Sequence, residues 1–293
     1  MSHSAPLPAS ASASSSSLPS PAAVADRLRA SGCVFAEDEA RLLLSAARTP
    51  GELAAMVDRR AAGLPLEHVL GWAEFCGLRI AVDPGVFVPR RRTEFLVRQA
   101  VSQAVSRSGP ARRVAPDRPL TVVDLCCGSG AVGAALATAL GRDGMPVDLH
   151  AADVDPAAVR CARRNVAAVG GRVYRGDLYG PLPAVLRGRV GVLLANAPYV
   201  PTGEIGLLPA EARVHEPRVA LDGGADGLEV QRRVIAGAPA WLAPGGSLLV
   251  ETSGRQAPLT AEAVARAGLV PRVAASGEWD ATVVVGTRPA SRG

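Results

Sequence analysis

The sequence predicts an α/β protein with a Rossmann-like parallel sheet, preceded by a small helical domain. Beyond about residue 120, short apolar runs alternate with helix-like segments, and this alternation is typical of parallel sheets. Before about residue 70 the apolar residues instead recur at helical spacing. At the end of the chain the apolar runs Leu269 to Ala274 and Thr282 to Val285 have no helix between them. This ending predicts a terminal hairpin with one antiparallel strand.

The N-terminal part is expected to contain a tail, a helical domain and a linker. Residues 1–21 are mostly Ser, Ala and Pro, which predicts disorder; a start codon assigned too far upstream is the alternative. Residues 22–70 predict a small helical domain with a substrate-recognition role. Residues 71–90 predict a hairpin linker, in which Asp83-Pro84-Gly85 is read as the turn between two short strands.

Residues 91–293 are expected to form the main domain. A helix is predicted from about Thr93 to Ser106, followed by a Pro/Arg/Gly loop from Gly109 to Pro119. The remaining expected elements are strands at 120–125, 147–153, 171–175, 190–195 and 246–251, and helices at 130–140, 156–168, 227–242 and 258–267.

Composition excludes several classes of function. The chain has 293 residues and no Lys, so all 32 basic residues are Arg, which rules out a Walker-A lysine or a Schiff base. The net charge of +5 indicates either an anionic partner or simply an Arg-rich surface, and the only dense basic run is Arg90-Arg91-Arg92. Five Cys without a Cys-x-x-Cys pair, and four separated His, predict neither a zinc site nor a disulfide framework.

Composition also bears on location. Reduced thiols predict a cytoplasmic protein. No apolar run approaches the roughly 20 residues of a membrane span, so no membrane association is expected.

A glycine-rich loop follows the first strand of the main domain. It contains G-x-G-x-x-G, but acidic Asp124 ends the strand and Gly128 comes four residues later, unlike a dinucleotide fingerprint. The pattern D-x-C-x-G-x-G resembles motif I of the S-adenosylmethionine-dependent methyltransferases, usually D-x-G-x-G-x-G. This resemblance implies a class I methyltransferase sheet, with S-adenosylmethionine as cofactor. Glycines let the backbone approach such a cofactor. The implied cofactor-binding residues are Asp124, Cys126, Cys127, Gly128, Ser129 and Gly130.

Two further acidic residues follow the next strands. Asp153 ends the second strand, where a carboxylate can bind ribose hydroxyls, and Asp155 before Pro156 is typical of a helix N-cap. The alternative is that both aspartates only cap the helix. After the third strand, Asp177 and Leu178 lie where this fold holds the adenine. Taken alone, that segment is a turn.

The tetrapeptide Asn196-Ala197-Pro198-Tyr199 follows the buried strand 190–195. It resembles the N-P-P-Y motif of methyltransferases that modify planar nitrogens, in which the Asn also lies beside the cofactor. As a bare sequence it is a strand-end turn. Its position downstream of the motif-I loop favours the functional interpretation, with Asn196, Ala197, Pro198 and Tyr199 as the catalytic residues.

The flanking segments resemble the HemK/PrmC family of protein N5-glutamine methyltransferases. Val88 to Val97 is similar to the family's P-R-P-x-T-E segment, and His215 to Leu228 to its E-P-x-x-A-L-x-G-G-x-D-G-L stretch. The resemblance also includes Leu66 to Leu78, Leu248 to Glu251 and Gly254 to Gln256, in order along the chain. It implies methyl transfer to a glutamine side chain of a protein, either a release factor or a ribosomal protein.

The sequence departs from the family pattern at two places. Ala197 replaces the first Pro of N-P-P-Y, and Arg91-Arg92 replaces the usual Pro-Glu. The resemblance implies that the main-chain carbonyl of Ala197 binds the substrate nitrogen, and that carbonyl survives the substitution. Two alternatives stay open, a DNA or RNA adenine-N6 methyltransferase and a non-catalytic S-adenosylmethionine-binding protein. Nucleic acid is not the expected substrate, and a monomer is expected.

Overall fold

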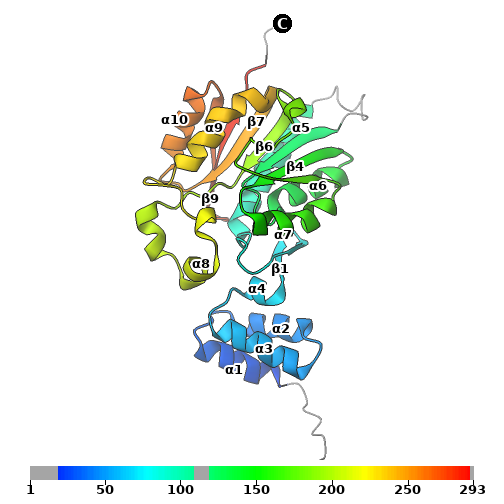
Figure 1. Cartoon of the computed structure of the whole chain (residues 1–293), viewed down its shortest axis with the longest axis vertical. Helices are drawn as coiled ribbons and strands as arrows, with labels where there is room; N and C mark the ends of the chain where they lie inside the picture. Colours follow the sequence, from blue (N-terminus) through cyan, green and yellow to red (C-terminus); the bar gives the residue numbers. More distant parts are fainter. Residues whose placement is uncertain (1–18, 109–118, 291–293) are drawn as a thin grey trace, which may run out of the picture. The chain divides into compact units, whose positions relative to one another are not determined.

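The computed structural model describes residues 19–108 and 119–290, which belong to two compact units, residues 1–70 and Gly71–Gly293 (Figure 1). The expected disorder of the N-terminal tail and the loop expected after Gly109 therefore lie almost entirely outside the described residues. Within the tail, Ser20 is described and caps the first helix.

Between residue 19 and Leu70 the N-terminal unit contains four helices, and local sequence explains where two of them, the first and the third, begin. The Ser20 side chain accepts a hydrogen bond from the Ala23 N–H, and that of Thr49 accepts one from the Glu52 N–H; a Pro follows each cap. The helices are α1 (Pro21–Ala30), α2 (Ala36–Ala46), α3 (Pro50–Ala61) and α4 (Leu66–Leu70).

A buried ion pair crosses the core of this unit. Arg60 donates from Nε to Glu39 Oε2 at 2.6 Å and from Nη2 to Oε1 at 3.0 Å. Arg60 also donates to the main-chain oxygen of Leu64. The two charged side chains are only 9% and 11% exposed, so each depends on the other for compensation.

The second unit begins with a hairpin, β1 (Trp72–Phe75) and β2 (Leu78–Ala81). Its turn is formed by Cys76 and Gly77, whose φ angles are +52° and +69°. The prediction that Asp83-Pro84-Gly85 turns this hairpin is wrong; that segment makes a separate turn after β2. Two-residue hairpin turns need positive φ at the first central position, and Pro fixes φ near −65°.

A seven-stranded sheet forms the centre of this unit, in the order β5-β4-β3-β6-β7-β9-β8. Every pairing is parallel except those of β9, which runs antiparallel to β7 and to β8. The predicted parallel sheet with an antiparallel terminal hairpin is therefore confirmed. The strands are β3 (Leu120–Leu125), β4 (Val147–Asp153), β5 (Arg172–Arg175), β6 (Val190–Ala195), β7 (Leu242–Thr252), β8 (Val270–Ser276) and β9 (Ala281–Thr287).

The strand β7 begins four residues before its predicted start. Leu242 pairs with Val190, and the register then shifts before Ser247 pairs with Val192. Pro244 and Gly245 fall within this irregular stretch, where Gly245 has a φ of +70°. A Pro-Gly-Gly run is typical of a loop, so the sequence predicted a later start for this strand than the bulged start that the structure has.

Helices cover both faces of the sheet (Figure 1). Alternate residues of β3 face opposite cores, with Val122 in one and Val123 in the other. On the Val122 face lie α5 (Glu94–Ser108), α6 (Ala131–Arg142) and α7 (Pro156–Ala167); on the other face lie α9 (Glu229–Trp241) and α10 (Ala257–Arg266).

The segment between β6 and α9 contains elements that the sequence analysis did not predict. They are η4 (Thr202–Leu207), α8 (Ala210–His215) and η5 (Arg218–Ala220); short 3-10 turns also occur at η1 (Arg91–Thr93) and η3 (Ala184–Leu186). None of the helices in the described residues combines the length and the apolar character that a membrane span requires.

We expect Glu39→Ala to destabilise the helical unit by about 3–5 kcal/mol, because the variant removes the carboxylate that compensates the buried Arg60 charge. Urea unfolding followed by circular dichroism measures the change. The control is Asp38→Ala, which removes an exposed ion pair with Arg41 and is expected to cost less than about 1 kcal/mol. Equal losses in the two variants would contradict the assignment.

Candidate active site

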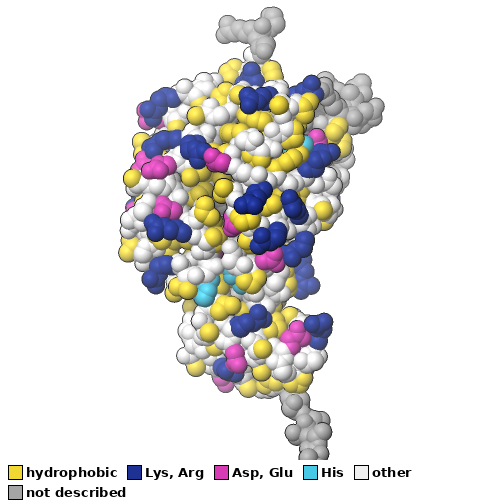
Figure 2. Space-filling model, viewed as in Figure 1, with side chains coloured by type: hydrophobic (Ala, Val, Ile, Leu, Met, Phe, Trp, Pro, Cys, Tyr) yellow, Lys and Arg dark blue, Asp and Glu magenta, His cyan; other side chains and the backbone are white. Residues whose placement is uncertain are grey.

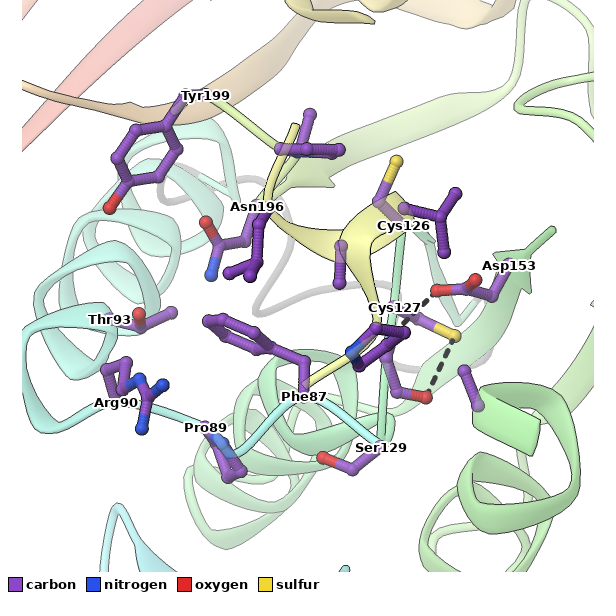
Figure 3. Close-up of a pocket in the computed structure, with 18 of the residues that line it drawn as sticks. Phe87, Pro89, Arg90, Thr93, Cys126, Cys127, Ser129, Asp153, Asn196 and Tyr199 are labelled. Carbon is purple, nitrogen blue, oxygen red and sulfur yellow. Dashed lines mark hydrogen bonds between the residues drawn. The ribbon is translucent and has the colours of Figure 1, made fainter. Parts of the chain in front are cut away.

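A cavity of about 790 Å³ opens at the carboxyl edge of the parallel strands (Figure 3). Its volume is within the range of small-molecule sites. Residues directly after β3, β4 and β6 line it, because parallel strands bring their carboxyl ends to one edge of a sheet. In Figure 3, Cys126 and Asp153 lie on one side, and Thr93 and Tyr199 lie on the other.

The glycine-rich loop after β3 depends on left-handed backbone at alternate positions. Cys126, Gly128 and Gly130 have φ angles of +54°, +54° and +78°. This conformation explains why glycine suits the first position, where the Cys126 side chain costs about 1–2 kcal/mol of strain. A Cβ on Gly128 would meet no atom within 4 Å, so the backbone here is open to a ligand.

Not every residue of the loop lines the cavity. Cys126, Cys127, Gly128 and Ser129 do, but Gly130 does not. A Cβ at Gly130 would lie 2.8 Å from Val166 Cγ2, so this glycine permits close packing of the loop against α7.

Asp124 supports the loop from beneath. Its buried carboxylate accepts a hydrogen bond from the Gly133 N–H to Oδ2 at 2.9 Å, and it also lines the cavity. A Cβ on Gly133 would lie 2.9 Å from that same Oδ2, so α6 can approach the carboxylate only with glycine there. Burial raises the pKa of Asp124 to about 7, while the Gly133 hydrogen bond acts in the opposite direction.

Asp153 holds the loop from the side. Its Oδ2 accepts from the Gly128 N–H at 2.8 Å and its Oδ1 from the Asp155 N–H at 2.9 Å. Burial raises the pKa of Asp153, against these hydrogen bonds. Each oxygen keeps a lone pair for a hydroxyl in the cavity. Asp155 accepts from the Ala157 N–H at 2.8 Å, which confirms its predicted N-cap role.

Asp177 and Leu178 follow β5 and line the same cavity. Leu178 has a φ of +45° and packs against the core between the sheet and α9. Asp177 forms an exposed ion pair with Arg233 of α9, which also lines the cavity and which the sequence analysis did not assign.

The tetrapeptide after β6 contributes a polar group and an aromatic ring. The Asn196 carboxamide lines the cavity, and no hydrogen bond to another described residue engages it (Figure 3). Ala197 is buried. The Tyr199 hydroxyl accepts from Arg92 Nη2 at 2.8 Å and donates to Glu251 Oε1 at 3.3 Å. Burial, together with the Glu251 charge, raises the pKa of Tyr199, so the phenol stays neutral.

The segment from His215 to Leu228 fixes the tetrapeptide from behind. Val200, directly after the tetrapeptide, exchanges main-chain hydrogen bonds with Leu221 and Gly223 of this segment. Outside the segment, Gln256 Nε2 also donates to the main-chain oxygen of Tyr199 at 2.9 Å. Gly227 has a φ of +76°, and a Cβ there would lie 2.3 Å from the Tyr199 oxygen. Its glycine is therefore required by the close approach of two backbones.

The opposite wall is formed by Phe87, Pro89, Arg90, Arg92 and Thr93, which the sequence analysis did not assign to the site. Its anchor is Glu216, whose buried carboxylate accepts from the Val88 N–H at 3.1 Å and from Arg90 Nη2 at 2.6 Å. Most of this wall lies in the family-like segment Val88 to Val97, and Glu216 lies in the family-like segment His215 to Leu228. The resemblance was therefore the signal that could have assigned them to the site. Trp279, which also lines the cavity, had none.

Acidic side chains outnumber basic ones around the cavity. Its lining contains Arg90, Arg92 and Arg233, against the six acidic residues Asp124, Asp153, Asp155, Asp177, Glu211 and Asp280. By contrast, basic side chains are more prominent than acidic ones on the face drawn in Figure 2, and several lie together near the middle of the view. An anionic lining suits a cationic sulfonium ligand.

The residues present fit S-adenosylmethionine. The open backbone at Gly128 and the remaining lone pairs of Asp153 can receive its ribose, and Leu178 offers an apolar surface to a purine. With the order of the seven strands, these features define a class I S-adenosylmethionine-dependent methyltransferase.

Comparisons with known proteins narrow this class. A family model described as "Methyltransferase small domain" matches residues 112–222. A release factor glutamine methyltransferase of Geobacter sulfurreducens is 38% identical over 207 residues, which cover 69% of this chain and 66% of that protein. One of Mycolicibacterium smegmatis is 37% identical over 235 residues, which cover 79% of this chain and 78% of that protein. The chain therefore belongs to the family of release factor glutamine methyltransferases.

Among solved structures, a ribosomal protein L11 methylase from Lactobacillus delbrueckii subsp. bulgaricus matches with a TM-score of 0.47 and 17% identity. The match covers 72% of this chain and 85% of that one.

We expect Asp124→Asn to stabilise the protein at neutral and alkaline pH. The pKa of Asp124 rises from 3.8 when unfolded to about 7 when folded, so the wild type loses stability as the pH rises through this window. Asn keeps an acceptor for the Gly133 N–H but does not titrate. Urea unfolding is expected to show a gain of up to about 4 kcal/mol at about pH 8 and none at about pH 4. A gain independent of pH would contradict this account.

Proposed function

We propose that this protein transfers the methyl group of S-adenosylmethionine to the side-chain amide nitrogen, N5, of a glutamine in a peptide chain release factor. The observation that carries the proposal is the Asn196 carboxamide, which has no described hydrogen-bond partner and lies in the same cavity as the glycine-rich loop. The relatives' names support the choice of a release factor as substrate.

An amide nitrogen is a poor nucleophile because its lone pair is delocalised into the carbonyl. In the proposed mechanism, the Asn196 side-chain oxygen and the Ala197 main-chain oxygen accept the two N–H groups of the glutamine amide. Both bonds strengthen as the nitrogen gains positive charge, and they direct its lone pair toward the methyl donor. When bound, S-adenosylmethionine supplies an electrophilic methyl group. The methylated nitrogen loses its proton after the transfer, so no general base is needed before attack.

Tyr199 presents its ring to the amide plane in this proposal. Two hydrogen bonds fix the ring, one from Arg92 and one to Glu251, which is itself almost fully buried. Fixed groups of this kind contribute by orientation, which can lower a barrier by about 7–11 kcal/mol in favourable cases. Ala197 supplies a main-chain group, so the absence of a proline ring leaves the proposed contact in place.

The proposed substrate acts in translation, and we place this protein in the cytoplasm. All five cysteines are free thiols, which supports a reducing compartment.

We expect Asn196→Ala to lower the rate of methyl transfer about 100-fold or more, because one acceptor that acts in the transition state is lost. Binding of S-adenosylmethionine, measured by calorimetry, should stay close to that of the wild type. The matched control is Ala197→Pro, which retains the main-chain carbonyl and is expected to keep near wild-type activity. Full activity of Asn196→Ala would contradict the proposed mechanism.

The substrate is tested in cells by mass spectrometry. In a strain that lacks the gene, one glutamine peptide of a release factor is expected to be lighter by one methylene group, and the wild-type gene should restore the mass. The Asn196→Ala gene should not restore it. Unchanged release factors alongside a change in a ribosomal protein would reassign the substrate. A change in adenine methylation alone would reassign the reaction.

A further inference from the structure

The three consecutive arginines Arg90, Arg91 and Arg92 have different environments: Arg90 and Arg92 line the cavity, whereas Arg91 does not. Arg90 is paired with buried Glu216, and Arg92 is held by Tyr199 and Glu251. Arg91 has no carboxylate within ion-pair distance among the described residues. Instead its guanidinium carbon lies 5.7 Å from the centre of the Trp279 ring. This arginine therefore keeps its hydrogen-bond donors available.

Trp279 lies in the turn between β8 and β9 and lines the cavity. Its ring also packs against the core on the α5 face of the sheet, which limits its movement. A second guanidinium, that of Arg98 on α5, lies 4.6 Å from the same ring centre. The tryptophan thus holds two cations in place at the rim of the active site.

A third arginine extends this surface along the edge strand. Arg272 of β8 is exposed and donates to Gln99 Oε1 of α5 at 3.2 Å. Like Arg91 and Arg98, it has no acidic partner within 4.0 Å in the part of the chain that is described. The nearest acidic residues in sequence, Glu94, Glu278 and Asp280, form no ion pair with any of the three among the described residues.

We infer that Arg91 and Arg98, which lie over Trp279, and Arg272, which is held by Gln99, form a docking patch for an acidic segment of the protein substrate. The inference rests on the proposed function, since it requires a protein substrate. The patch is continuous with the cavity through Trp279, so a chain that inserts its glutamine there passes over it. A planar guanidinium can bind a carboxylate through two parallel hydrogen bonds, which gives register as well as attraction.

The same geometry disfavours nucleic acid as the occupant. Single-stranded nucleic acid is bound by stacking its bases on free aromatic faces. Here two guanidinium groups already lie over the tryptophan ring. The ring therefore orients cations and is not a free platform for a base. Guanidinium groups bind carboxylates and phosphates alike, and a protein substrate supplies the carboxylates.

The test compares two substrates. One is an intact, unmethylated release factor from the same organism, and the other is a short glutamine peptide of that factor without acidic residues. For Arg91→Glu/Arg98→Glu we expect kcat/KM toward the intact factor to fall at least about tenfold, chiefly through KM, with a weaker dependence on salt. Turnover of the peptide and binding of S-adenosylmethionine should not change.

The matched control is Arg142→Glu/Arg189→Glu, which makes the same change of charge at two exposed arginines away from the cavity. Arg142 ends α6, and Arg189 directly precedes β6. It should leave both substrates unaffected. Trp279→Ala should lower kcat/KM toward the intact factor in the same way. Trp279→Phe should retain most of the wild-type kcat/KM, because a smaller aromatic face remains to orient the two arginines.

The outcomes separate this inference from the proposed function. If the wild type methylates neither substrate, the proposed function fails. If it methylates both and the double variant has an unchanged KM for the intact factor, the docking patch is refuted. An equal loss on factor and peptide would overturn it as well, because the arginines would then act within the site. The docking patch would also be overturned if the wild type bound a short single-stranded RNA, the double variant lost that binding, and the KM of the variant for the intact factor stayed the same.

Discussion

The cofactor half of the site depends on two carboxylates, buried Asp124 and partly buried Asp153, that hold one loop. Asp153 accepts from the N–H of Gly128 and Asp124 from the N–H of Gly133, so the loop between β3 and α6 is fixed at both ends. Because both donors are main-chain groups, the carboxylates determine the path of the backbone. The glycines follow from this arrangement, since α6 can approach Asp124 only where no Cβ intervenes. The cofactor-binding loop is therefore positioned by residues at the ends of strands β3 and β4.

The substrate half of the cavity is built differently. The tetrapeptide is held by residues from other segments, and Gly227 allows the backbone of one of these segments to touch that of Tyr199. Tyr199 is then oriented by Arg92 and Glu251, which belong to two other elements. The proposed catalytic groups are thus held by residues that do no chemistry themselves. This explains why similarity to the family extends well beyond the tetrapeptide.

Sequence patterns predicted the sheet well because its strands are short, apolar and bounded by polar residues; β3, β4 and β6 occur where they were expected. The pattern failed where backbone geometry overrides composition, at the Cys76-Gly77 turn and at the bulged start of β7. The acidic and amide residues that end strands were identified because parallel strands bring their carboxyl ends to one edge of the sheet. Thr93, Glu216 and Trp279 could not be found in this way, because their place at the cavity depends on contacts between distant segments.

The link between Glu216 and Val88 joins residues separated by 128 positions, whereas the link between Asp153 and Gly128 spans only 25. The two halves of one cavity therefore differ in contact order. The cofactor half can assemble from a contiguous stretch of chain. The substrate half is complete only when the segment around Glu216 has packed against the segment around Val88. Closing that large loop carries the greater entropic cost. Substitutions in the wall at Phe87 to Thr93 can consequently alter substrate choice while the local, cofactor-binding half remains folded.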